Sequence, residues 1–372
     1  MFETTVQRAL IRGRAPATIV RPQPVEPPWP EVTVVVPCYN YGRYLEDSVG
    51  SVLSQSEVEV RVVIIDDASP DGSAHIAERI AQRDSRVSLI RHETNAGHIA
   101  TYNEGLGATQ SEFVALLSAD DLLTPGALGR ATALMRAFPS VGFTYGRPVV
   151  FQGEVPPPAR TKARTWTVWK GSDWIADRCR IGRNAIWAPE AVMRTSVLKE
   201  AGLFDAEHPH SGDLDLWLRM ARISDVGLIS GADQGWYREH LASMSRTTFA
   251  GQITDLKARR RTFKSAVASL PNSEELFQQA ELALAREAVR TAFAAQAQPS
   301  VREDVVEELV AFARSTWPDA DTLPEARFLR SAADPPSSMA GRVVQSARER
   351  LELLRGTLKG RIRTWRSHVT GV

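Results

Sequence analysis

Short apolar runs alternate with longer amphipathic segments between Glu31 and about residue 150. The runs are rich in valine and isoleucine and indicate strands, whereas apolar residues three to four positions apart indicate helices. Parallel strands need long crossover connections, so this alternation predicts an open, mostly parallel α/β sheet flanked by helices. We expect strands at Val32–Pro37, Val60–Ile65, Val87–Ile90, Phe113–Leu117 and Val141–Tyr145. We expect helices at Tyr44–Ser54, Ser73–Arg83, Ile99–Ala108 and Pro125–Phe138.

The remaining segments differ from this pattern in composition. Residues 1–30 hold arginines and then a proline-rich stretch, without the apolar core of a secretory signal, and predict a flexible arm. Three successive prolines in Phe151–Ala163 predict a surface loop between two halves of one domain. Helical spacing begins after about residue 250, and a polar linker precedes a last basic helix. We expect parts at 1–30, 31–150, 151–250, 251–333 and 334–372, with extension helices at Leu256–Ser269, Glu274–Gln298 and Val301–Trp317.

Composition limits the classes of protein to consider. The chain has 372 residues, 43% of them hydrophobic, enough to bury one sizeable core and a smaller second one. Its net charge of +1 gives no global attraction to nucleic acid, and we expect no such partner. Cys38 and Cys179 lack metal-ligand or redox-pair spacing. No apolar run approaches the roughly 20 residues of a membrane-spanning helix, so we expect a soluble, cytoplasmic protein.

Polar clusters follow the predicted strands where each strand ends. They include Asp66 and Asp67 after the second strand and Asp120 and Asp121 after the fourth. A single Asp-Asp pair is usual in turns, where the carboxylates accept local hydrogen bonds. Several clusters at successive strand ends meet in one crevice, where open α/β sheets bind ligands. Adjacent carboxylates repel each other, and a bound divalent cation relieves this repulsion and neutralises a diphosphate.

Four motifs, in this order and spacing, resemble family 2 glycosyltransferases with the GT-A fold over roughly Glu31 to Arg246. They are Pro37-Cys38-Tyr39-Asn40, Asp66-Asp67-Ala68-Ser69, Asn95-Ala96-Gly97 and Ser118-Ala119-Asp120-Asp121. The resemblance implies a nucleotide pocket lined by Pro37, Tyr39, Asn40, Asp67 and Asn95, with Asp67 on the base.

The resemblance also implies a metal site. Asp121 would be its principal ligand, and Asp120 would lie by the ribose and the phosphates. Many family members have an acid where this chain has Ser118, so the site here depends on Asp120 and Asp121. Mn²⁺ or Mg²⁺ is the expected cofactor, and a nucleoside-diphosphate sugar is the expected donor.

The segment around Asp213 predicts the start of a partly buried helix. Ser211 is a candidate cap, and carboxylates at Asp213 and Asp215 suit the positive end of the helix dipole. For Asp215, stabilisation of the helix start and a role in the active site are both open interpretations. For Asp213 the segment resembles the family's Glu-Asp motif, which implies the general base, although Gly212 replaces the usual Glu. An inverting transfer needs one such base within hydrogen-bond reach of the acceptor hydroxyl.

Further polar and aromatic residues follow on both sides of this helix. The run Trp236-Tyr237-Arg238-Glu239-His240 resembles the family's Tyr-Arg-x-His segment, which makes His240 a candidate metal or diphosphate contact. Arg238 and Arg246 are candidates to pair with phosphate oxygens through planar, bidentate hydrogen bonds. We expect most of the tryptophans near residues 166–187 to pack in the core, and one or two to contact the acceptor.

The C-terminal residues from Arg342 to Val372 have apolar side chains at helical spacing among many arginines. Such a basic amphipathic helix either lies peripherally on the inner face of an anionic membrane or docks on its own domain. Both alternatives remain open.

These features predict a metal-dependent, inverting glycosyltransferase. The Gln-x-x-Arg-Trp motif and the membrane helices of processive family members are missing, which favours transfer of one sugar per encounter. The family suggests a saccharide or lipid-linked acceptor in cell-envelope polysaccharide or glycolipid synthesis. One alternative is a sugar-phosphate nucleotidyltransferase, although Pro37–Gly42 is not a glycine-rich phosphate loop. The other is a non-catalytic sugar- or nucleotide-binding relative.

Overall fold

The computed structural model describes residues 7–8, 16–240, 251–296 and 303–326. The chain forms two compact units. Of the described residues, the first contains 7–8, 16–177 and 184–240, and the second contains 178–183, 251–296 and 303–326. The domain boundaries expected from the sequence stay predictions.

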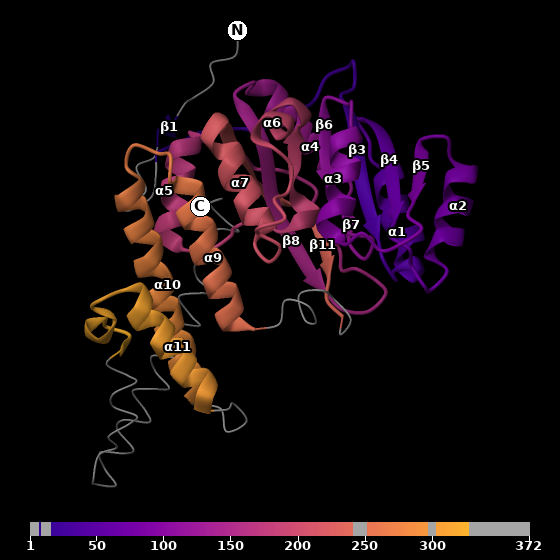
Figure 1. The fold of residues 1–372 in the computed structure, drawn as a ribbon. Coiled ribbons are helices and arrows are strands. Elements are labelled where there is room, and N and C mark those ends of the chain that lie inside the picture. Colours follow the sequence, from indigo (N-terminus) through magenta and orange to yellow (C-terminus); the bar gives the residue numbers. More distant parts are fainter. Residues whose placement is uncertain (1–6, 9–15, 241–250, 297–302, 327–372) are drawn as a thin grey trace. The chain divides into compact units, whose positions relative to one another are not determined.

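One mixed sheet forms the centre of the first unit (Figure 1). Its strands are β1 (Gln7–Arg8), β2 (Ala17–Val20), β3 (Glu31–Cys38), β4 (Glu59–Asp66), β5 (Val87–Arg91), β6 (Phe113–Leu116), β7 (Leu122–Leu123), β8 (Val141–Phe151), β9 (Thr165–Trp169), β10 (Val192–Arg194) and β11 (Asp225–Arg238). Strand β3 pairs in parallel with β4 and β6, β4 with β5, and β8 with β11. The short strand β10 lies between β6 and β8, antiparallel to both. The predicted open, mostly parallel sheet is confirmed.

The helices of this unit connect and cover the strands. They are α1 (Gly42–Leu53), α2 (Ser73–Arg83), α3 (His98–Ala108), α4 (Ala127–Ala137), α5 (Gly171–Ile181, which continues into the second unit), α6 (Thr195–Ala201) and α7 (Gly212–Ile223). A short 3-10 helix, η1, spans Ala188–Glu190. The expected strands and helices between residues 32 and 145 are confirmed, with ends shifted by a few residues. Pro125 precedes α4 instead of starting it, because Gly126 takes a left-handed conformation at the cap.

Alternating side chains of the central strands pack on opposite faces of the sheet. Val34 and Val36 belong to one buried cluster with Leu45 of α1 and Leu128 of α4. Val35 points to the other face, where Gly105 of α3 approaches it so closely that a β-carbon would clash. The two buried faces explain why these strands read as continuous apolar runs.

The prediction of a flexible arm over residues 1–30 is wrong for Ala17–Val20. These residues form β2, which pairs antiparallel with β9. Val20 and Val25 are buried, with 6% and 7% of their surface exposed. The β-branched residues of this segment extend the sheet at the free side of β9, an energetic gain that the neighbouring prolines conceal in the sequence.

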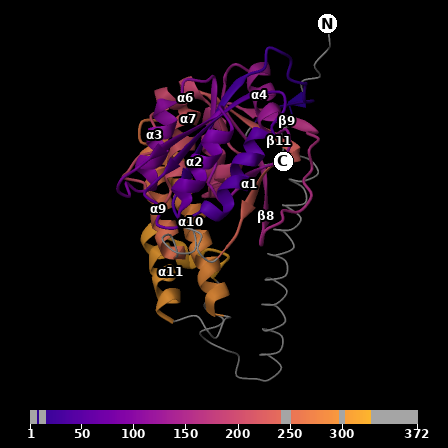
Figure 2. The ribbon, with the colours of Figure 1, turned by 90° about the vertical axis from the view of Figure 1, so that its right-hand side faces the viewer.

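The second unit is helical. Helices α9 (Gln252–Val267), α10 (Ser273–Gln296) and α11 (Glu303–Thr316) lie side by side in both views (Figure 1, Figure 2), followed by η2 (Ala320–Thr322). Arg259 of α9 is nearly buried and bonds to Asp255 and to Glu287 of α10. The three expected extension helices are confirmed. No helix in the described parts of the chain is long and apolar enough to cross a membrane.

Candidate active site

A cavity of about 950 Å³ lies at the carboxyl ends of β3 and β4. All five residues predicted to line a nucleotide pocket do line it: Pro37, Tyr39, Asn40, Asp67 and Asn95. Tyr41, Arg43, His98, Thr101 and Tyr102 also contribute to its wall. The strand-end residues converge because neighbouring parallel strands end at the same edge of the sheet. Which part of a ligand each residue contacts stays a prediction.

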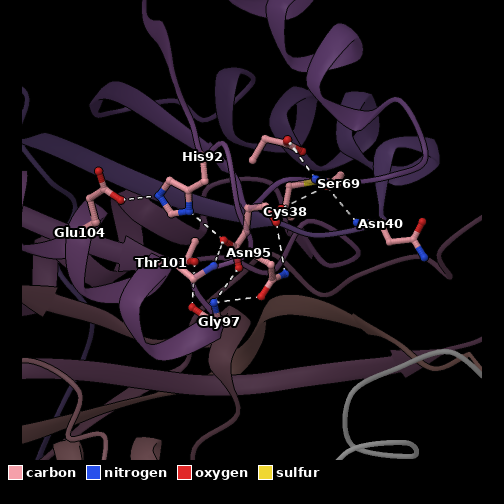
Figure 3. Close-up of polar contacts among 11 residues, drawn as sticks. Cys38, Asn40, Ser69, His92, Asn95, Gly97, Thr101 and Glu104 are labelled. Atoms are coloured by element: carbon pink, nitrogen blue, oxygen red, sulfur yellow. Dashed lines mark hydrogen bonds and ion pairs between the residues drawn. The ribbon is translucent and has the colours of Figure 1, made fainter.

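Two tight turns support the residues that line the cavity. Asn40 and Ala68 both take left-handed backbone conformations, with φ of 63° and 56°. Such angles are uncommon for residues other than glycine and need support from their surroundings. Ser69 supplies it, because its Oγ accepts a hydrogen bond from Asn40 N at 3.0 Å (Figure 3), while Ser69 N donates to Asp66 Oδ2 at 3.2 Å.

Asp67 organises a further part of the cavity lining. Its Oδ1 accepts from Ala96 N at 2.7 Å and its Oδ2 accepts from Gly97 N at 3.0 Å. Asn95 Nδ2 donates to the Asp67 carbonyl at 3.2 Å. Burial by itself raises the pKa of Asp67, but hydrogen bonds from Ala96, His92 and Gly97 outweigh burial and lower the pKa. Asp67 is therefore an ionised acceptor that holds the Asn95–Gly97 turn in place.

His92 was not found from the sequence. Its Nδ1 lies 2.7 Å from Asp67 Oδ1, and its Nε2 lies 2.6 Å from Glu104 Oε2. Figure 3 shows the ring between Glu104 on one side and Asn95 and Gly97 on the other. Hydrogen bonds to Asp67 and Glu104 raise the pKa of His92. No local pattern indicates this role, because α3 brings Glu104 to the ring only in the folded chain.

Asp120 and Asp121 follow β6 and are both buried, with 8% and 1% of their surface exposed. Arg238 N donates to Asp121 Oδ1 at 2.9 Å, and His240 Nε2 lies 3.0 Å from Asp120 Oδ2. Burial raises the pKa of Asp121 well above its usual value, and the charge of Asp120 adds to this effect. The predicted metal residues thus lie together, in a place where negative charge is costly.

This donor set fits a cation that shares its ligands with a substrate. Among the residues that the structure describes, no group of three or more His, Cys, Asp or Glu side chains forms a full protein cage for a metal. Mg²⁺ and similar hard cations are commonly held by one or two carboxylates together with substrate phosphates and water. Asp120 and Asp121 supply such a partial shell.

The pairing of Arg238 with phosphate stays a prediction, and in the structure this side chain turns inward. The side chain is only 2% exposed, and its guanidinium lies 4.6 Å from the ring centres of both Tyr44 and Phe151. Its Nε donates to the Asp120 carbonyl at 2.9 Å, and a second nitrogen donates to the Gly153 carbonyl. Arg238 turns inward because these carbonyls and rings provide a buried site for its charge. It holds the Asp120–Asp121 turn through its backbone N–H and its guanidinium.

Asp213 lies in the first turn of α7. Asn184 Nδ2 donates to Asp213 Oδ2 at 2.6 Å, and Leu214 N donates to Asp213 Oδ1 at 2.7 Å. Ser211 occupies the cap position as expected, but its side chain makes no capping hydrogen bond. Asp215 is buried and pairs with Arg219 at 2.8 Å, so its role is structural. Asn184 is a second residue that the sequence did not reveal.

Electrostatic interactions show that the acids share one neighbourhood. Burial raises the pKa of Tyr102, a cavity residue, and the charges of Asp120, Asp213 and Asp121 raise it further. Burial also raises the pKa of Glu190, where Asp121 and Asp213 again contribute. The predicted metal residues and the predicted base therefore influence the same two side chains, Tyr102 and Glu190, although they come from distant parts of the sequence.

The tryptophans of this region differ in burial, and contact with an acceptor stays a prediction. Trp166 and Trp174 are buried, each with 1% of its surface exposed. Trp187 is 42% exposed and packs edge-on against Tyr237, with ring centres 4.8 Å apart. It is the best candidate among them for acceptor contact. Arg246 and the predicted helix from Arg342 to Val372 lie outside the described residues.

The chain is similar to known proteins in sequence. The glycosyl transferase family 2 model matches residues 33–200. An uncharacterized glycosyltransferase of Haemophilus influenzae is 24% identical over 197 residues, which cover 52% of this chain and 61% of that protein. The uncharacterized protein MT1568 of Mycobacterium tuberculosis is 30% identical over 249 residues, covering 64% of this chain and 73% of that protein. The putative teichuronic acid biosynthesis glycosyltransferase TuaG of Bacillus subtilis is 38% identical over 92 residues, 25% of this chain and 36% of TuaG.

Solved structures share the fold. S. aureus TarS 1-349 in complex with UDP-GlcNAc matches with a TM-score of 0.59 and 16% identity, over 88% of this chain and 92% of that chain. The mannosyltransferase PcManGT from Pyrobaculum calidifontis, in complex with GDP-Man and Mn²⁺, matches with a TM-score of 0.51 and 18% identity, over 87% and 85% of the two chains. Together with the sequence matches and the strand-end motifs, these similarities show that the chain belongs to glycosyl transferase family 2.

Proposed function

We propose that the chain transfers one sugar from a nucleoside-diphosphate sugar to a hydroxyl group of an acceptor, with inversion at the anomeric carbon. One observation carries the proposal. The strand-end cavity has Asp67 in its wall, and Tyr102 in the same wall feels the charges of Asp120, Asp121 and Asp213. In this proposal a nucleotide site, a cation site and a general base would meet at one cleft, as a displacement at a sugar–phosphate bond requires.

The nucleotide would occupy this strand-end cavity. Asp67 and Asn95 offer acceptors and donors for a base and ribose, while Tyr39, half exposed at 50%, offers a ring face for stacking. The matched structures hold UDP-GlcNAc in TarS and GDP-Man in PcManGT, which supports a nucleotide-sugar donor here.

Asp120 and Asp121 would hold the divalent cation, with His240 beside Asp120. When bound, the cation neutralises the diphosphate and stabilises it as the leaving group. Arg238 keeps the Asp120–Asp121 turn in position through its backbone N–H and its guanidinium. PcManGT was solved with Mn²⁺, which supports Mn²⁺ or Mg²⁺ as the cofactor here.

Asp213 would act as the general base. Both of its oxygens accept N–H hydrogen bonds, which suits the ionised form that can take a proton. In a single displacement the acceptor oxygen bonds to the anomeric carbon as the bond to the diphosphate oxygen breaks. The hydroxyl proton passes to Asp213, and the bonding electrons leave with the nucleoside diphosphate.

The relatives suggest a setting in the cell envelope. TuaG is named for teichuronic acid biosynthesis, and the chain spans 36% of its length. We propose that the acceptor is a saccharide or a lipid-linked saccharide of an envelope polymer or glycolipid. The reaction would then take place in the cytoplasm, at or near the inner face of the membrane.

Turnover of a donor panel tests the function. UDP-, GDP-, CDP-, ADP- and dTDP-sugars are incubated with the purified chain, with Mn²⁺, Mg²⁺ or EDTA, and release of nucleoside diphosphate is measured. We expect release from one donor class, lost with EDTA and in Asp121→Asn. Nuclear magnetic resonance of the glycoside made with a simple alkyl glycoside as acceptor reads the anomeric configuration, which we expect to be opposite to that of the donor.

Two other outcomes would identify the alternative functions. Release of pyrophosphate from a nucleoside triphosphate and a sugar phosphate would identify a nucleotidyltransferase. Tight binding of a donor without turnover in any combination would identify a non-catalytic relative.

A further inference from the structure

His92 follows β5 and has a carboxylate at each ring nitrogen. Asp67, at the end of β4, faces Nδ1 at 2.7 Å, and Glu104, in α3, faces Nε2 at 2.6 Å. The His92 and Asp67 side chains are 15% and 5% exposed, whereas Glu104 is 44% exposed. Among the residues that the structure describes, the charged groups that contact the ring are these two carboxylates.

This geometry requires a proton on both nitrogens. An ionised carboxylate can only accept hydrogen bonds, so each nitrogen of His92 must donate. A neutral ring carries one N–H and would turn a lone pair toward one of the two carboxylates. When His92 loses a proton, one of its two hydrogen bonds is lost, and the nitrogen lone pair then repels the carboxylate that it faces.

The contact matters for the cavity because Asp67 holds its wall. The same Asp67 oxygen that faces His92 accepts from Ala96 N, and the other oxygen accepts from Gly97 N. Asp67 and Gly97 both line the cavity. Movement of the Asp67 carboxylate would therefore displace the turn that faces the ligand.

We propose that protonated His92, held by Glu104, is a positioning residue for nucleotide binding. It keeps Asp67 ionised and oriented, so the cavity binds a nucleoside diphosphate best while His92 carries its proton. The inference rests on the proposed function, because it takes the cavity to be the nucleotide site. His92 touches no reacting atom and acts through Asp67.

The test measures the affinity of UDP, GDP, CDP, ADP and dTDP with Mn²⁺ by calorimetry, between about pH 6 and pH 9, where histidine charge changes. Four proteins are compared: the wild type, His92→Gln, Glu104→Gln and His75→Gln. His75 is an exposed histidine on α2 that pairs with Glu78, outside the cavity wall, and serves as the matched control. The terminal phosphate of each nucleotide titrates near pH 6 whichever of the four proteins is used. Differences between the proteins in the pH dependence of binding therefore report on His92.

We expect the wild type and His75→Gln to lose about tenfold in affinity as the pH rises, the scale of one charge-assisted hydrogen bond. His92→Gln should bind about tenfold more weakly at low pH and lose this pH dependence. Glu104→Gln should keep the drop but shift it to lower pH, because one of the two anions that favour the charged ring is gone. The histidine ring signals in nuclear magnetic resonance should show the same shift of the His92 titration.

Two results would overturn the inference while leaving the proposed function intact. One is nucleotide affinity and pH dependence in folded His92→Gln equal to the wild type. The other is a His92 titration in Glu104→Gln that equals that of the wild type. The Glu104 side chain is exposed, so this substitution should not disturb folding. If the wild type binds none of the five nucleotides, the proposed function fails and the inference fails with it.

Discussion

The side-chain amide of Asn184 donates a hydrogen bond to Asp213 Oδ2 at 2.6 Å. The amide orientation is set by its other end, because Asn184 Oδ1 accepts from Ile186 N at 3.1 Å. A loop residue ahead of η1 thus orients the candidate base at the start of α7. The arrangement resembles the general pattern in which a base is held by a third group.

Replacing Asn184 tests this orientation. We expect Asn184→Ala to lower kcat about tenfold to a hundredfold, since a hydrogen bond to a charged group contributes about 1.5–3 kcal/mol. The KM for the donor should change little, because Asn184 contacts the general base Asp213 and does not contact the residues that would bind the nucleotide. Steady-state kinetics with the active donor checks both values. An equal loss in donor affinity would mean that Asn184 supports the fold of the whole cleft.

Arg238→Lys tests the positioning of the Asp120–Asp121 turn. Lysine keeps the charge but cannot reach the Asp120 and Gly153 carbonyls together. We expect the free energy of unfolding to fall by about 2–3 kcal/mol and Mn²⁺-dependent nucleotide affinity to weaken. Urea denaturation and calorimetry measure the two effects. Arg91→Lys, at an exposed arginine paired with Glu78, should change stability by less than about 0.5 kcal/mol.

Glu190 makes stability depend on pH. It is 1% exposed, its Oε1 accepts from Trp187 N at 2.6 Å, and burial raises its pKa well above the usual value. Because the folded pKa lies above the unfolded value of 4.5, its contribution to stability is complete below about pH 4.5 and is lost as the pH rises toward the folded pKa.

Glu190→Gln should remove this pH dependence. We expect the variant to be more stable than the wild type at neutral pH and to match it near pH 4.5, because the protonated acid and the amide are both neutral. Thermal unfolding across this range, with EDTA present to exclude cations, gives the comparison. Parallel curves for the two proteins would show that Glu190 is not the group responsible.

Two glycines provide a matched pair for the packing of the first unit. A β-carbon on Gly105 would lie 2.9 Å from Ile65 Cδ1 and closer still to Val35, whereas one on Gly50 of α1 would meet nothing within 4 Å. We expect Gly105→Ala to cost about 1–3 kcal/mol through overpacking. Gly50→Ala should add about 0.5–1 kcal/mol, because alanine favours the helix. Urea denaturation measures the free energy of unfolding of both variants. Equal changes in the two variants would contradict the close approach of α3 to Val35.

The sheet and the cavity wall could be predicted from the sequence because both depend on local patterns. Buried parallel strands require apolar runs, and the residues that follow them must meet at one edge. Asp67 was found in this way, whereas Asn40 and Asn95 were expected from the resemblance to the family. The antiparallel insertion of β10 was missed, since three residues give no periodicity to recognise.

Residues whose role depends on a distant partner could not be found from local patterns. His92 needs Glu104, and Asn184 needs Asp213, and only the fold brings each pair together. The inward direction of the Arg238 side chain could not be predicted for a related reason. A motif places the residue near the site, but the buried carbonyls and rings around the side chain decide which way it points.

The central claim is that one cleft combines a nucleotide site with the base Asp213. The most direct measurement compares donor binding with donor turnover in Asp213→Asn, an isosteric change that removes the base. The account predicts donor affinity close to that of the wild type, with transfer slowed about a hundredfold to ten-thousandfold, the usual contribution of a general base. Unchanged transfer in Asp213→Asn would contradict it.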